Sequence, residues 1–99
     1  MAERHLIVDG MMSGTGIRDA MAGDYLFTDE LGLSSHLREE IVEWLGGYER
    51  AHFRRYKDEN ENRRLDVEGT EIAKRVQEEL PNDKVQYYSN AYLKRIQIA

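Results

Sequence analysis

A glycine-rich segment near the N-terminus has the residue types needed to bind a phosphate or another anion. It follows the short apolar run Leu6-Ile7-Val8 and the dipeptide Asp9-Gly10. Backbone N–H groups in such loops can point together at an anion. The candidate anion-binding residues are Gly10, Ser13, Gly14, Thr15 and Gly16. Because the segment has neither the Gly-Lys-Ser/Thr of a P-loop nor the spacing of a dinucleotide fingerprint, the favoured interpretation is a turn-rich connecting loop.

Acidic side chains gather in the second half of the chain. They are Asp58, Glu59, Glu61, Asp66, Glu68 and Glu71. Such a cluster is usually a solvated helix face that benefits from the helix dipole. The alternative is an acidic docking surface for a basic protein, such as a nuclease toxin, because complementary charge speeds association and gives specificity. We therefore treat these six residues as candidate partner-binding residues.

The chain offers little for metal or covalent chemistry. It has no cysteine, which excludes thiolate metal ligands and cysteine nucleophiles. Glu and His lie three positions apart at His36/Glu39 and at Glu49/His52, but a carboxylate-bridged site needs more such motifs, on more helices, than this chain provides. His52 lies on a predicted apolar helix face, where a half-buried histidine is the simpler interpretation. We expect no metal, no cofactor and no enzymatic activity.

A stretch of aromatic and basic residues near the C-terminus is a further candidate. Tyr87-Tyr88 and Tyr92 precede Lys94 and Arg95, and aromatic rings beside cations can form a stacking platform for single-stranded nucleic acid. Strand alternation should turn at least one of the paired tyrosines into the core. The formal net charge of −5 argues against a nucleic-acid partner. A weak contact through residues 87–95 remains an alternative.

The elements that position these residues follow from the apolar spacing. A short strand is predicted over 4–10, and the region 9–33 is expected to be irregular, with at most a short helix near 17–22. Ser34 is a good N-cap for a helix whose apolar face runs from Leu37 through Trp44 to Tyr56 at steps of three and four. The face continues across Gly46-Gly47, so we predict one unbroken helix despite the cost of these glycines.

A polar linker over 58–63 is predicted to lead into a second helix, over about 64–80. Gly69 lies on the apolar stripe of this helix and is expected to let the two helices approach closely. Pro81-Asn82-Asp83 ends the helix. A strand is predicted over 84–88, and alternation over 92–98 indicates a further strand at the sheet edge, through which two copies of the chain can pair.

The resulting order, β-loop-α-α-β-β, favours an α+β fold of two layers. Two antiparallel helices would pack on one face of a small, mainly antiparallel sheet. The 99 residues suit a single domain over 1–99. The sequence contains no apolar run long enough to cross a bilayer and no signal peptide, so we expect a cytoplasmic protein without membrane contact.

Part of this pattern resembles a loose group of small bacterial proteins of unassigned function. The resemblance covers roughly residues 31–88. It is carried by Leu31-Gly32-Leu33-Ser34, Trp44, Tyr48-Glu49, Asp66-Val67-Glu68-Gly69, the run from Ile72 to Leu80, and Val85-Gln86-Tyr87. Some members of the group look like immunity proteins or antitoxins that neutralise a partner toxin. The resemblance rests mainly on helix-capping residues and on the spacing of core residues, so it concerns the fold more than the function. It supplies no catalytic residue.

The sequence therefore predicts a small, acidic, non-enzymatic protein that acts by binding another protein. The resemblance suggests an immunity-like or antitoxin-like inhibitor, either a monomer or an edge-strand homodimer. Two alternatives stay open at this point. One is an anion-binding or small-ligand-binding domain that uses the loop 10–16, and the other is the single-stranded nucleic-acid contact through 87–95.

Overall fold

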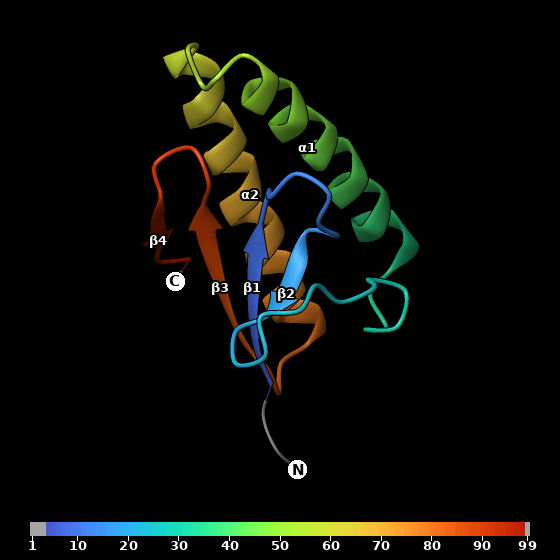
Figure 1. Cartoon of the computed structure of the whole chain (residues 1–99). Coiled ribbons are helices and arrows are strands. Elements are labelled where there is room, and N and C mark those ends of the chain that lie inside the picture. Colours follow the sequence, from blue (N-terminus) through green and yellow to red (C-terminus); the bar gives the residue numbers. More distant parts are fainter. Residues whose placement is uncertain (1–3, 99) are drawn as a thin grey trace.

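The computed structural model describes residues 4–98, and over this range the chain forms four strands and two helices (Figure 1). The strands are β1 (His5–Asp9), β2 (Ile17–Asp19), β3 (Lys84–Ser89) and β4 (Lys94–Ile96). The helices are α1 (Ser35–Phe53) and α2 (Glu59–Glu79). Residues 1–3 and 99 of the predicted domain lie outside the described residues.

The strands form one sheet in the order β2-β1-β3-β4. The outer pairs, β1 with β2 and β3 with β4, are antiparallel. The central pair of β1 and β3 is parallel, because the two-helix connection returns the chain beside β1 in the same direction. Both helices lie on one face of this sheet (Figure 1). The expected two-layer α+β fold is confirmed, with a sheet that is mixed at its centre.

The region 9–33 contains the largest departure from the predicted elements. This region was expected to be irregular, with at most a short helix near 17–22, whereas Ile17–Asp19 form strand β2. The side chain of Ile17 is fully buried, and Ile17 pairs with Val8 of β1. This tertiary pairing outweighs the weak local helix signal. The chain then turns at Gly23, and Tyr25 returns to form an isolated bridge with Arg18.

Helix α1 begins after Ser34, as predicted. The Ser34 Oγ accepts a hydrogen bond from the N–H of Leu37 at 3.3 Å, and the helix continues unbroken through both glycines. It ends at Phe53, before the apolar pattern predicted, because Arg55 and Tyr56 both take a left-handed backbone conformation with φ 56°. His52 is exposed rather than half-buried.

Helix α2 begins earlier than predicted. Residues 59–63, expected to be a polar linker, form its first turns. Asp58 supplies the N-cap, since its Oδ1 accepts a hydrogen bond from the N–H of Glu61 at 3.2 Å. The connection between the helices is therefore the short segment 54–58.

The core fills the space between the two helices and the sheet face that they cover. Trp44 is 2% exposed, and its Nε1 donates a hydrogen bond to the carbonyl of Leu65 at 2.8 Å, which confirms the predicted face of α1. Gly69 admits the ring of Tyr87 from β3 rather than the other helix. The helices approach each other at Gly47, where a Cβ would lie 2.8 Å from the Leu65 side chain. In the described part of the chain, neither helix is long and apolar enough to span a bilayer.

Candidate functional site

The loops that follow β1 and β3 lie at the same edge of the sheet, because these two strands are parallel. Loop 10–16 follows β1 and turn 90–93 follows β3. Open sheets with parallel strands commonly bind ligands at this edge. Asn90 joins the two loops, since its side-chain oxygen, in the orientation that satisfies its hydrogen bonds, accepts from the N–H groups of Gly10 at 3.1 Å and Met11 at 3.0 Å.

The five candidate anion-binding residues lie together in loop 10–16, and most of their groups are used inside the protein. Each glycine approaches a side chain that a Cβ would overlap: Gly10 meets Tyr48, Gly14 meets Tyr25 and Gly16 meets Ile41. The Thr15 hydroxyl donates to the carbonyls of Ile17 and Leu26. Ser13 is exposed in a left-handed conformation with φ 71°. These contacts explain the glycine spacing by packing alone.

Asp9, the last residue of β1, has a buried carboxylate that accepts three hydrogen bonds. It is 1% exposed, and its Oδ2 accepts from Arg18 Nε at 2.6 Å. Its Oδ1 accepts from the Tyr25 hydroxyl at 2.6 Å and from the N–H of Met11 at 3.2 Å. Burial, followed by this hydrogen bond to Asp9, raises the pKa of Tyr25. The carboxylate therefore holds β2 and the segment after it against β1.

Asp66 belongs to the core and not to an acidic docking surface, which corrects its assignment from the sequence. It is 7% exposed, and its Oδ1 accepts from the hydroxyls of Tyr48 at 2.5 Å and Tyr87 at 2.6 Å. Its Oδ2 accepts from Ser89 Oγ at 2.6 Å. Burial raises the pKa of Tyr48 to about 12 and raises the pKa of Tyr87 further. This Asp66 cluster joins α1, α2 and β3 beneath turn 90–93.

The other five acidic candidates lie at the surface or along α2, and each has a hydrogen-bond partner. Asp58 caps α2. The remaining four each form an ion pair with a basic side chain: Glu59 with Arg63, Glu61 with Arg54, Glu68 with Arg64, and Glu71 with Lys74. The surface of α2 therefore has mixed charge. For Glu59, Glu68 and Glu71, a basic residue three or four positions away on the helix was the sequence signal for this pairing. The pair of Glu61 with Arg54 joins α2 to the end of α1 instead.

The aromatic and basic stretch is divided between the two faces of the sheet. Tyr87 is fully buried, so one of the paired tyrosines does face the core as predicted. Tyr88 and Arg95 are partners in register on the opposite face. The hydroxyl of Tyr92 instead reaches Glu59 of α2 at 2.5 Å. The three tyrosines that sequence reasoning treated as one aromatic patch therefore lie in three different places.

Turn 90–93 contains an unusual leucine that the sequence did not indicate. Leu93 is 73% exposed and has a left-handed backbone with φ 55°. Apolar alternation had placed it with Ile96 in a strand, whereas it closes the turn before β4. A left-handed conformation suits glycine and costs other residues about 1–2 kcal/mol. The one signal in the pattern was its spacing: Leu93 is three positions from Ile96, so strict strand alternation puts the two side chains on opposite faces.

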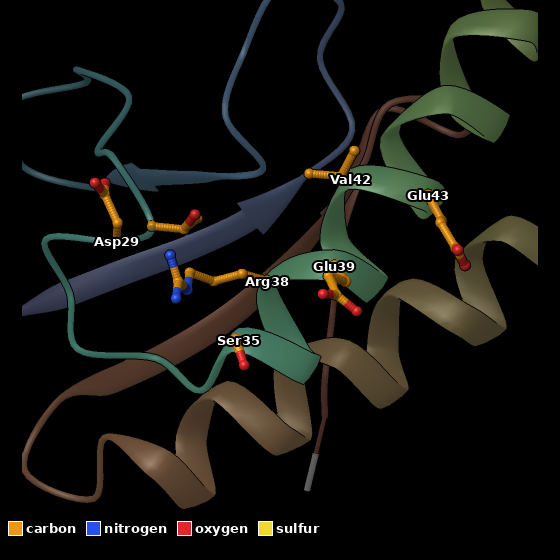
Figure 2. Close-up of a pocket in the computed structure, with 7 residues that line it drawn as sticks. Asp29, Ser35, Arg38, Glu39, Val42 and Glu43 are labelled. Carbon is orange, nitrogen blue, oxygen red and sulfur yellow. The ribbon is translucent and has the colours of Figure 1, made fainter.

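A hollow of about 600 Å³ lies elsewhere, between α1 and the segment that precedes it. Figure 2 shows Arg38 reaching from α1 toward the loop that carries Asp29. The Arg38 Nε is buried and has no hydrogen-bond partner among the described residues. Because Asp29, Glu39 and Glu43 also line the hollow, its charges favour neither an anion nor an apolar ligand.

Comparison of the chain with protein-family models, with curated proteins and with solved structures gives no match. Within residues 4–98, no group of three His, Asp or Glu side chains is placed to hold a metal ion. Functional inference therefore rests on the geometry of the chain itself, and the sheet edge formed by loop 10–16 and turn 90–93 is the candidate site.

Proposed function

We propose that this chain is a non-enzymatic protein-binding module whose main anchor is Leu93. The observation that carries the proposal is the combination of a large apolar side chain, 73% exposure and a left-handed backbone at this residue. A leucine here brings the fold little buried area and an unfavourable conformation. Residues that break a local rule without benefit to the fold are those expected at functional positions.

The turn that presents Leu93 is firmly held. The Ser89 Oγ accepts from the N–H of Tyr92 at 3.0 Å, and the Tyr48 hydroxyl accepts from the N–H of Ala91 at 3.4 Å. Both acceptors belong to the Asp66 cluster. A preorganised anchor loses little conformational entropy when it binds, so more of the contact energy appears as affinity.

Loop 10–16 adds adaptable apolar surface to the same sheet edge. Met11 and Met12 are exposed in this loop, and Asn90 fastens the loop to turn 90–93. Methionine side chains adapt well to the shape of a partner surface. The anion-binding alternative has less support, because Asn90 already engages the N–H groups of Gly10 and Met11.

The form of binding that we favour is inhibition of a partner protein in the cytoplasm, in line with the resemblance to immunity proteins and antitoxins. We favour a monomer over the edge-strand homodimer. The exposed edge strand β4 has only three residues, and two of them, Lys94 and Arg95, are charged. Short, charged edge strands disfavour pairing between copies.

Site-specific photo-crosslinking in the source cells tests the proposal. A benzoylphenylalanine at position 93 should give one discrete adduct with a partner protein. The matched control places the same group at Val67, which is 62% exposed on α2. The proposal is contradicted if position 93 gives no adduct, or if both positions give the same adducts. The captured partner would then be assayed for loss of its activity on addition of this chain.

A further inference from the structure

The two helices cover one face of the sheet and leave the other face without a helix (Figure 1). His5 Nε2 lies 2.7 Å from Gln86 Oε1, and Arg95 Nη1 donates to the same oxygen at 3.3 Å. These contacts place side chains of β1, β3 and β4 on this one face. Ile7 of β1 lies on the same face by alternation and is fully buried.

This face is positively charged although the whole chain is acidic, with a net charge of −5. Strand alternation and register direct eight strand residues to it: His5, Ile7, Asp9, Arg18, Lys84, Gln86, Tyr88 and Arg95. Three of them are basic and one is a carboxylate. That carboxylate, Asp9, is already paired with Arg18 at 2.6 Å. Lys84 and Arg95 therefore face solvent as exposed cations.

An aromatic ring lies among these cations. Tyr88 is half-buried on β3, one of the two central strands, and Arg95 is its neighbour in register on β4. The guanidinium of Arg18 lies 5.8 Å from the centre of the Tyr88 ring on the other side. Single-stranded nucleic acids bind to such surfaces because bases stack on aromatic rings while cations contact the phosphates.

We propose that this open face binds single-stranded nucleic acid, with a base on Tyr88 and phosphates on Lys84 and Arg95. Charge complementarity favours a polyanion over a neutral or basic partner, and the half-buried ring of Tyr88 between cations favours one with unpaired bases. The proposal is independent of the protein contact proposed above, because that contact uses Leu93 at the sheet edge. It also differs from the sequence-based candidate: Arg18 and Lys84 join the site, whereas Tyr92 and Lys94 leave it, since Lys94 is in register with Ser89 on the other face.

Fluorescence anisotropy with a labelled 15-nucleotide single strand, either oligo(dT) or oligo(U), tests the proposal. We expect binding at 50 mM NaCl and a salt slope near −1.4 for the two phosphate contacts, which is roughly a sevenfold loss of affinity at 200 mM NaCl. The double variant Lys84→Gln/Arg95→Gln should reduce this slope by about 1.4. The matched control, Arg64→Gln/Lys74→Gln on α2, removes the same charge and should leave the slope unchanged.

A Tyr88→Leu variant tests the stacking contact, and circular dichroism checks that it folds. We expect affinity for the single strand to fall about tenfold, and a duplex of equal length to bind more weakly than the single strand. If Tyr88→Leu does not fold, the charge variants still decide the matter, since both altered side chains are exposed. Three results would overturn the proposal: no binding at 50 mM NaCl, equal losses in the two double variants, or equally tight binding of polyglutamate.

Discussion

The ring of Tyr87 occupies the space that a side chain at position 69 would need. An ideal Cβ on Gly69 would overlap the outer ring atoms and the hydroxyl oxygen of Tyr87. That hydroxyl donates to Asp66, less than one helical turn before Gly69, at 2.6 Å. Because Gly69 has no side chain and Asp66 accepts a hydrogen bond from the hydroxyl, the Tyr87 ring packs between α2 and β3 and holds the helix on the sheet.

Gly69→Ala should therefore destabilise the protein. The added methyl would displace the Tyr87 ring from its hydrogen bonds, and we expect a loss of about 3 kcal/mol in the free energy of unfolding. Gly46→Ala in α1 is the matched control, because the nearest atom to its added Cβ is the mobile end of Arg50 at 3.6 Å. That variant should gain up to about 1 kcal/mol. Urea denaturation measures both, and equal changes would contradict this account.

Trp44→Ala should be among the most destabilising substitutions in α1. It empties a core position and leaves the Leu65 carbonyl without its indole donor. We expect a loss of about 4 kcal/mol in the free energy of unfolding. Val42→Ala, on the exposed side of the same helix, should change it by less than about 0.5 kcal/mol. A melting curve like that of the wild type for Trp44→Ala would show that the indole contributes little to the core.

The Asp66 cluster gives a direct test of its buried carboxylate. Asp66→Asn keeps the shape of the side chain but replaces one carboxylate oxygen with an NH2 group. That group cannot accept the hydrogen bond that a hydroxyl donates there. We expect a loss of about 2 kcal/mol in the free energy of unfolding, measured by chemical denaturation. Glu68→Gln, which removes one exposed partner of Arg64, should cost no more than about 0.5 kcal/mol. If Asp66→Asn left the free energy of unfolding unchanged, the hydroxyls would have found other acceptors.

The same cluster predicts how stability depends on alkaline pH. Burial raises the pKa of Tyr48 to about 12 and raises the pKa of Tyr87 as well. A raised pKa means that the neutral tyrosines stabilise the fold fully below pH ~10, their unfolded value. This contribution is lost as the pH rises through about 12 for Tyr48. Absorbance at 295 nm should show these two phenols ionising only as the protein unfolds, and Tyr48→Phe should unfold with a weaker dependence on pH above 10.

Features encoded locally were predictable from the sequence. Ser34 caps α1 and Trp44 lies on its buried face, because a cap and a helical period need only neighbouring residues. The role of Asp66 was missed, since its hydroxyl partners come from α1 and β3. One signal was present: position 66 falls on the buried stripe of α2, four residues after Asn62 and three before Gly69.

Strand β2 and turn 90–93 depend on tertiary contacts that local patterns do not contain. Ile17–Asp19 become a strand only because β1 offers them an edge for pairing. Leu93 was expected in a strand with Ile96, yet the turn before β4 leaves it exposed. The sheet also separates Tyr88 from Tyr92, although they are four residues apart. Register across strands, and not spacing along them, decides which residues share a face.

The Leu93→Gly variant tests the central claim most directly, because stability and binding should change in opposite directions. Glycine relieves the left-handed strain and loses little buried surface, so the free energy of unfolding should stay the same or rise by up to about 1 kcal/mol. Binding to the partner captured through position 93 should fall at least tenfold, while the Val67→Ala control keeps its affinity. A stable Leu93→Gly variant that binds as tightly as the wild type would contradict the account.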